Sequence, residues 1–181
     1  MRILREDEFR DEMLERYLDE TYFKLRHGLS ELKREVLPAG FRLTKAAPEN
    51  LARHISICYD REGITAQELE RLQEHFTYNP ALWIALEDIA SNELVASGIA
   101  GLDQNIGEGI LEWIQVSPAY RRRGLGRDLV CELLSRMESK ADFVTVSGQV
   151  NNQSRPELLY ESCGFQDRVV WHILTRKEKS T

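Results

Sequence analysis

The stretch from Leu111 to Met137 constrains the fold of this chain more than any other, because it joins a strand, a glycine-containing loop and a helix. The alternation from Ile110 to Val116 predicts a strand that is mostly buried on both faces. Ser117 and Pro118 end this strand, because proline has no N–H group for the ladder and restricts the residue before it. After the loop, apolar side chains recur at helical spacing, which predicts a helix with one apolar face.

The junction between this loop and the helix is a candidate anion-binding site. The first N–H groups of a helix lack internal partners, and the macrodipole places partial positive charge there. Gly124 and Gly126 have no side chains that would hold a phosphate away from the backbone. The arginines at 121–123 add positive charge in an otherwise acidic chain. On the loop alone, a surface turn with solvated arginines is an equally good account.

Size and charge limit the class of protein. At 181 residues the chain can bury a substantial core and is expected to be one domain with a small appendage. The net charge of −6 disfavours general nucleic-acid binding, although a basic patch remains at Arg121–Arg127. No apolar run approaches the roughly 20 residues of a membrane helix, and the N-terminal residues lack the apolar core of a signal peptide. We therefore expect a cytoplasmic protein that binds neither nucleic acid nor a membrane.

Cysteine and histidine usage favours neither disulfides nor a metal site. The three cysteines lie far apart in the sequence with no paired spacing, and the four histidines show no metal-ligand spacing. Reduced thiols of a cytoplasmic protein account for the cysteines. No metal is expected.

Residues 1–38 are expected to form an N-terminal helical extension to the domain formed by residues 39–181. Residues 6–37 are predicted to be helical almost throughout, because apolar side chains recur at a spacing of three and four, close to a heptad seam. These side chains are Leu18, Tyr22, Leu25, Leu29, Leu32 and Val36. Such an arm packs on the domain or against a second copy of the chain in a homodimer. Alternatively, it forms a lid over a substrate cleft.

The remaining chain predicts an α/β (α+β) fold, with a mixed, mostly antiparallel, twisted sheet of six to seven strands flanked by helices. Residues 65–68 form a capping box, and Pro48 suits the first position of a helix. The strand after the glycine-loop helix is expected to be parallel to the strand before it. The expected strands are 41–45, 82–87, 94–102, 110–116, 143–146 and 169–174, and the expected helices begin at Pro48, Thr65, Leu125 and Pro156.

Two motifs in this order resemble a known family. Arg121-Arg122-Arg123-Gly124-Leu125-Gly126 fits the acyl-CoA loop Q/R-x-x-G-x-G/A of the GCN5-related N-acetyltransferase (GNAT) family, and residues 159–165, LYESCGF, are similar to its C-terminal LYxxxGF element. The resemblance covers about residues 40 to 176 and implies the acyl-CoA N-acyltransferase type of fold. A phosphate-binding Walker loop would need Lys and then Ser or Thr after the last glycine, where this chain has Arg127 and Asp128.

The resemblance implies that acetyl-CoA is the co-substrate. It implies that backbone amides from about Arg121 to Gly126 hold the coenzyme A pyrophosphate, and that the strand around Ile114 offers backbone hydrogen bonds to the pantetheine arm, as an added strand would. Asn151 or Asn152 falls near the position of a cofactor-binding asparagine, and solvated loop asparagines are an equally good account. The candidate cofactor-binding residues are Ile114, Gln115, Val116, Arg121, Arg122, Arg123, Gly124, Leu125, Gly126, Arg127 and Asn152.

Two residues are candidates for the catalytic chemistry. By resemblance Tyr160 is the acid that protonates the departing thiolate, whereas the alternative is a tyrosine packed on the sheet. Glu112 is a candidate base, because partial burial in a strand raises the pKa of a carboxyl group. If no bulge intervenes, alternation places Glu112 on the same face as Ile114 and Val116. Glu112 could instead contact a cationic substrate group or anchor a water molecule.

The sequence thus favours a transferase that moves an acetyl group from acetyl-CoA to a primary amine by direct attack. The acceptor is a small molecule or a peptide, and the sequence does not identify it. Two other classes stay open: an acyl-CoA-binding sensor, and a catalytically inactive GNAT-like module that binds partners. An intact Tyr160 argues against both.

Overall fold

The computed structural model describes residues 1–32, 36–59 and 63–177. They form one eight-stranded sheet in the order β1-β8-β2-β7-β6-β5-β4-β3, in which β6 and β7 are parallel and the other pairs antiparallel. The strands are β1 (Arg2–Arg5), β2 (Tyr17–His27), β3 (Phe41–Thr44), β4 (Trp83–Asp88), β5 (Leu94–Asp103), β6 (Glu108–Val116), β7 (Phe143–Gln149) and β8 (Gln166–Arg176). The predicted mixed sheet is confirmed, with eight strands where six to seven were expected.

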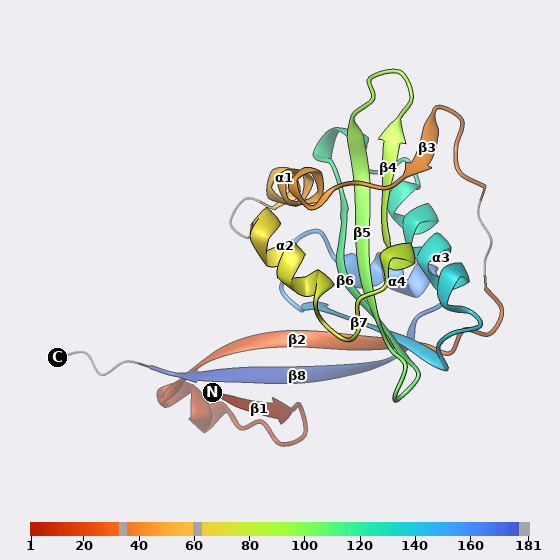
Figure 1. Ribbon diagram of the computed structural model, residues 1–181. Coiled ribbons are helices and arrows are strands. Elements are labelled where there is room, and N and C mark those ends of the chain that lie inside the picture. The colour runs from red at the N-terminus through yellow and green to blue at the C-terminus, as the bar shows by residue number, and fades with distance from the viewer. Residues whose placement is uncertain (33–35, 60–62, 178–181) are drawn as a thin grey trace.

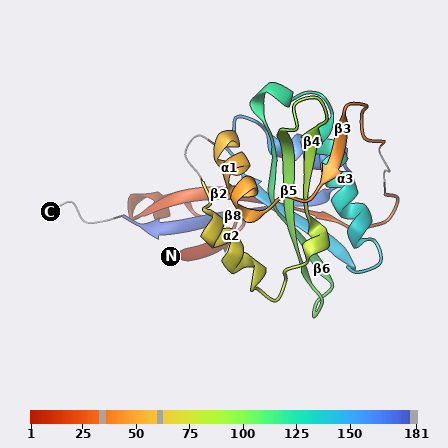
Figure 2. The same ribbon diagram turned by 45° about the horizontal axis from the view of Figure 1, so that its top comes forward.

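Helices cover both faces of the central strands (Figures 1 and 2). The α-helices are α1 (Pro48–Cys58), α2 (Ala66–Gln73), α3 (Leu125–Met137) and α4 (Pro156–Ser162), and short 3-10 helices lie at η1 (Asp11–Glu15), η2 (Pro80–Leu82) and η3 (Pro118–Tyr120). The predicted capping box is present at Thr65, whose side chain and backbone pair with Glu68. Pro48 lies in the first turn of α1, as expected.

Two apolar clusters hold these layers together. The larger cluster lies between the sheet and α3, and it includes Leu129, Leu133 and Tyr160. The smaller one packs α1 and α2 on the other face, through residues such as Ile55, Leu69 and Trp83. The central strands have apolar side chains on both faces, because each face packs against one of these clusters and is shielded from water.

The predicted N-terminal helical extension is wrong. Residues 2–5 and 17–27 are strands, and β2 lies inside the sheet between β7 and β8. Phe23 and Leu25 are 0% and 1% exposed in the larger cluster, whereas Leu18 is 58% exposed. The physical reason is that strand pairing with β7 and β8 overrides the local helical spacing. Part of this predicted helical segment, residues 33–35, lies outside the described residues.

The outer parts of β2 and β8 run with β1 beyond the helix-covered part of the sheet (Figure 1). The segment between β1 and β2 covers one face of this ribbon. There the Phe9 ring stacks on His172 at 3.9 Å, and His172 Nδ1 lies 2.8 Å from Asp19 Oδ2. The N-terminal residues are therefore an integral part of the sheet.

Candidate active site

The parallel strands β6 and β7 separate part of the way along the sheet. They pair from Glu108 with Phe143 to Leu111 with Val146. Beyond this point β6 continues to Val116 and β7 to Gln149 without further pairing between them in the described sheet. From Glu112 onward, the edge of β6 that faces β7 is therefore open to a ligand.

Two residues of β6 direct their backbone groups into this opening. Ser117 N–H donates to the Val95 carbonyl at 2.8 Å, so residues 113 and 115, at two-residue steps along the ladder, also bond to β5. The intervening residues Ile114 and Val116 then point their N–H and C=O groups toward the opening. This edge can pair with an extended ligand as it would with another strand.

Two side chains donate hydrogen bonds to the backbone carbonyl groups of this edge. Tyr59, which follows α1, donates its hydroxyl to the Ile114 carbonyl at 3.4 Å, and its ring stacks edge-on against Trp113. Arg121 Nε donates to the Val116 carbonyl at 3.2 Å. The carbonyl groups are thus accessible to hydrogen-bond donors that enter the opening. Sequence analysis missed Tyr59, because it follows a helix end with no motif around it.

Gln115, a predicted cofactor-binding residue, is directed elsewhere. Its backbone pairs with Ser97 of β5, and its side chain, 5% exposed, donates to Ser97 Oγ. The same hydroxyl lies 2.8 Å from His54 Nδ1, and His54 Nε2 lies 2.9 Å from Ser117 Oγ. This buried polar network ties α1 to the end of β6.

A β-bulge places Glu112. Ile99 is opposite Trp113 while the next residue, Ala100, is opposite Leu111, so Glu112 is an extra residue on β6. The bulge breaks the alternation, so the condition under which Glu112 was expected to share a face with Ile114 and Val116 is not met. Ile114 packs near Leu133 on the α3 side, whereas Glu112 lines a cavity on the α2 side.

The environment of Glu112 suits a proton acceptor. Glu112 is exposed as a whole, but partial desolvation of its carboxyl group beside the cavity raises its pKa above the usual range, and the nearby His75 opposes this shift. A carboxylate with a raised pKa is a stronger base, and it stays ionised only above that pKa. Glu112 therefore combines a position at the first unpaired residue of β6 with a pKa moved toward neutrality.

The glycine loop takes the shape expected of an anion site. Gly124 is the N-terminal cap of α3 and has a φ of 87°, which L-residues with side chains rarely adopt. Within the described residues, the N–H groups of 122–126 donate no backbone hydrogen bond to the protein. A Cβ atom on Gly126 would lie 3.3 Å from Leu159 and 3.4 Å from Val116. Gly126 therefore allows the start of α3 to approach β6 and α4 closely.

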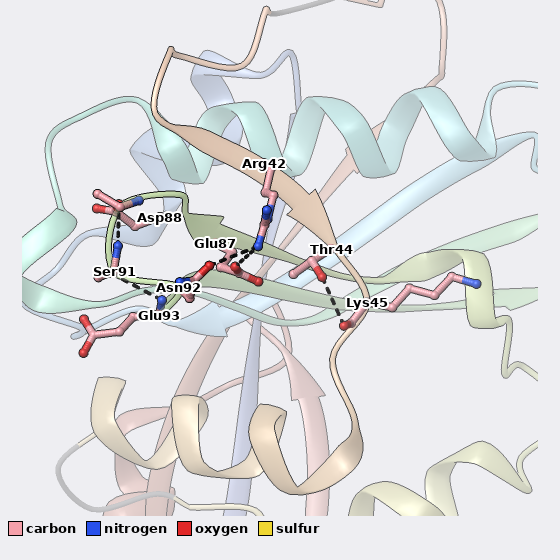
Figure 3. A network of polar contacts seen from close by, with 9 residues as sticks. Arg42, Thr44, Lys45, Glu87, Asp88, Ser91, Asn92 and Glu93 are labelled. Atoms are coloured by element: carbon pink, nitrogen blue, oxygen red, sulfur yellow. Dashed lines mark hydrogen bonds and ion pairs between the residues drawn. The ribbon is translucent and has the colours of Figure 1, made fainter.

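The arginines of the loop differ in their contacts. Arg123 lies over the Tyr120 ring at 4.9 Å, and the Tyr120 hydroxyl donates to Asp88 Oδ2 at 3.0 Å. The β4–β5 hairpin that carries Asp88 is itself braced by Arg42, which contacts Glu87 and Asn92 (Figure 3). Arg122 is exposed and has a φ of 65°.

The remaining predicted cofactor residues also lie in or near this loop. The Leu125 side chain is buried in the core, so only its backbone can face a ligand. Arg127 lies in the first turn of α3. Asn152 Oδ1 accepts hydrogen bonds from the N–H and hydroxyl groups of Ser154, at 2.9 and 2.7 Å, in the turn before α4. The side-chain oxygen of Asn152 therefore already accepts two hydrogen bonds within its own turn.

Tyr160 lies on α4 and is 6% exposed, with its ring edge-on to Phe165. Burial, with smaller contributions from Tyr59 and Cys163, raises the pKa of its phenol. The hydroxyl therefore stays protonated at physiological pH and can act as a donor. Gly164, which follows the C-terminal cap of α4, has a φ of 101°. A Cβ atom at this position would lie 2.9 Å from His27 Nε2, which explains the glycine before Phe165.

Within residues 1–32, 36–59 and 63–177, no group of three or more His, Cys, Asp or Glu side chains is arranged to hold a metal ion. The helices of these described segments include none long and apolar enough to cross a membrane.

Comparisons with known proteins agree with this geometry. The acetyltransferase (GNAT) domain model matches residues 79–167. No curated protein matches the sequence. Among solved structures, the GCN5-related N-acetyltransferase of Sphaerobacter thermophilus has a TM-score of 0.70 at 16% identity, over 90% of this chain and 54% of that chain. This chain thus spans about half the length of that protein.

Two smaller proteins share the same fold. The ribosomal-protein-S18-alanine N-acetyltransferase of Escherichia coli has a TM-score of 0.58 at 17% identity, over 78% of this chain and 97% of that one. Ard1 of Thermoplasma volcanium has a TM-score of 0.56 at 14% identity, over 77% and 100%. With both motifs, the open edge of β6 and the domain match in agreement, the chain carries a domain of the GCN5-related N-acetyltransferase family.

Proposed function

We propose that this protein is an acyl-CoA-dependent N-acetyltransferase that moves an acetyl group from acetyl-CoA to a primary amine by direct attack. The observation that carries the proposal is the separation of β6 from β7 after Leu111. The open edge of β6 leads directly to the glycine loop, so one continuous path joins Glu112 to the start of α3.

The residues along this path fit the parts of coenzyme A. The N–H groups of 122–126, which donate no backbone hydrogen bond within the described residues, and the arginines suit the pyrophosphate. Ile114 and Val116 offer backbone groups to the amides of the pantetheine arm. The missing Cβ atom of Gly124 leaves the loop backbone accessible, and that of Gly126 lets the start of α3 lie close to β6. When the anion binds, Arg121 releases the Val116 carbonyl and donates its hydrogen bonds to the anion instead.

Three groups of the chain carry out the proposed chemistry. When bound, acetyl-CoA supplies an acetyl thioester, whose carbonyl the Ile114 N–H group polarises. Glu112, directly or through a water molecule, accepts the proton that the acceptor nitrogen loses as its C–N bond forms. Tyr160 donates the proton that the sulfur gains as the C–S bond breaks. The products are an amide and free coenzyme A.

Thermal unfolding with acetyl-CoA tests the binding step. A ligand that binds only the native state raises its stability by RT ln(1 + [L]/Kd), so millimolar acetyl-CoA should raise Tm by several degrees. Release of free thiol with an added amine tests the transfer step. An unchanged Tm at millimolar acetyl-CoA would contradict the proposal, and a raised Tm without thiol release from any amine would favour an acyl-CoA sensor.

A further inference from the structure

A cavity of about 240 Å³ opens beside Glu112 on the α2 side of the sheet. Side chains of α2, β4 and the connection between them line it together with the carboxylate: Leu72, His75, Thr77, Tyr78, Trp83 and Glu112. His75 Nδ1 lies 2.8 Å from Thr77 Oγ1, which holds the imidazole at the wall. The cavity therefore lies where β6 leaves β7, at the point to which the reactive end of the cofactor path leads.

A second cavity of similar volume, about 240 Å³, lies on this part of the molecule. The two share Tyr78, whose ring packs edge-on against Trp83 at 5.3 Å. Three carboxamide side chains and two apolar ones complete its lining: Asn79, Gln104, Asn105, Phe76 and Leu102. The two cavities thus share Tyr78 as a wall, and together they are called the groove. Their lining residues extend from Glu112 to the β5–β6 turn.

The two cavities, which are referred to below as the first and second compartments, differ in the charge of their lining. The first contains the Glu112 carboxylate beside aromatic rings, a combination that attracts an ammonium group by charge and by ring faces. Among the described residues, the lining of the second contains no charged side chain. Asn79 Oδ1 already accepts from the Ala81 N–H at 2.9 Å, so Asn79 offers its Nδ2 donor group. Carboxamides provide both donors and acceptors, which is what peptide groups require.

We propose that this groove binds a peptide-like acceptor, with its terminal amine at Glu112 and its neutral, amide-containing body along Tyr78, Gln104 and Asn105. The inference rests on the proposed acetyltransferase function and adds a substrate class to it. A polyamine or an aminoglycoside fits less well. Its second cationic group would lie beside carboxamides and Phe76, and the described residues that line the second cavity include no carboxylate to pair with it.

Steady-state kinetics with three matched acceptors test the inference. With saturating acetyl-CoA and thiol release as the readout, trialanine amide should have a kcat/KM about 30-fold above that of alaninamide, the factor that corresponds to two added hydrogen bonds of about 1 kcal/mol each. Spermidine should give the lowest value. A kcat/KM for spermidine above that for trialanine amide would overturn the inference, and so would equal values for trialanine amide and alaninamide.

Variants of the second compartment sharpen the test. The double substitution Gln104→Ala and Asn105→Ala should reduce the ratio of the trialanine amide and alaninamide values toward one. Gln67→Ala removes an exposed carboxamide of α2 that does not line the groove, and it should keep the ratio. An unchanged ratio in the double variant would overturn the inference.

The failure of this inference is distinguishable from failure of the proposed function. If acetyl-CoA raises Tm and spermidine alone releases thiol, the chain is an acetyltransferase and the peptide-like acceptor is wrong. If acetyl-CoA leaves Tm unchanged and no acceptor releases thiol, both are wrong.

Discussion

The cofactor side and the acceptor side of the candidate active site are built from different parts of the chain. The cofactor side consists mainly of backbone groups: the open edge of β6 at Ile114 and Val116, and the N–H groups of the glycine loop. The acceptor side consists of side chains, with Glu112 on β6 and the others on α2, β4 and two turns. Binding on the cofactor side therefore depends on backbone shape, and binding on the acceptor side depends on which side chains are present.

This difference has a chemical consequence. Backbone groups are the same in every residue, so a backbone site recognises one invariant ligand and depends mainly on where glycines allow close approach. Side chains differ in charge and shape, so the acceptor side can be changed without disturbing the cofactor path. Substitutions on the two sides should therefore change different measured quantities.

The largest effect is expected from Gly126→Asp on the cofactor side. The new carboxylate lies at the start of α3, where the pyrophosphate is expected, and about 100-fold weaker binding of acetyl-CoA should result from repulsion and lost charge-assisted hydrogen bonds. Acidic residues in the first turn stabilise a helix, so α3 should persist. Isothermal titration with acetyl-CoA measures the change.

Gly126→Ala is the matched control. Its Cβ atom would approach the flexible Leu159 side chain at 3.3 Å, which can adjust. Binding within a few-fold of the original protein is expected. If Gly126→Asp binds acetyl-CoA as well as Gly126→Ala does, the loop is not the pyrophosphate site.

An effect of similar size, on turnover and not on cofactor binding, is expected from the two candidate catalytic residues on opposite faces. Tyr160→Phe should lower kcat about 100-fold, because it removes the proton donor. Glu112→Gln should lower kcat/KM and also remove its decline at acidic pH, because partial desolvation raises the pKa of Glu112 and the base is lost as pH falls through that raised value. Acetyl-CoA affinity should change little in both variants.

The pH profile separates the two roles. Tyr160→Phe keeps Glu112 and should keep the acidic decline at its reduced rate. A decline that persists in Glu112→Gln would show that another group acts as the base. Turnover unchanged in Tyr160→Phe would remove the acid role.

The same contrast explains what the sequence could and could not predict. The glycine loop, α3 and α4 depend on patterns within a few residues, and the predicted helices ending at Met137 and spanning residues 156–162 match the structure. Tyr160 was identified from its motif with Gly164 and Phe165. Backbone sites of this kind are local, so their residue types can be recognised along the chain.

Features that depend on distant strands were missed. Leu18, Tyr22 and Leu25 have a helical spacing, but β2 forms because β7 and β8, more than a hundred residues away, pair with both of its edges. The bulge at Glu112 depends on the register with β5. The acceptor cavity combines residues 72–83 with residues 100–112, and the spacing within each segment contains no sign of the other.

The smallest effect is expected at His54, which links α1 to the end of β6 on the cofactor side. Its ring bonds to Ser97 and to Ser117, the residue that precedes the cofactor loop, and burial lowers its pKa. In the unfolded chain the ring titrates near its ordinary pKa of 6.5, so below that pH the unfolded state binds a proton that the folded state does not. Stability from this source is full above pH 6.5 and is lost as the pH falls toward the lowered pKa.

We therefore expect Tm to fall between pH 7.5 and 5.5, and His54→Gln to reduce this fall. His27, whose pKa burial also lowers, should account for part of the slope that remains. Ser97→Ala is the matched control, because it breaks the same network, at a cost of about 1 kcal/mol, without removing a titratable group. It should lower Tm at pH 7.5 and retain the slope. Equal slopes in His54→Gln and the original protein would show that the neutral ring at position 54 is not what links stability to pH.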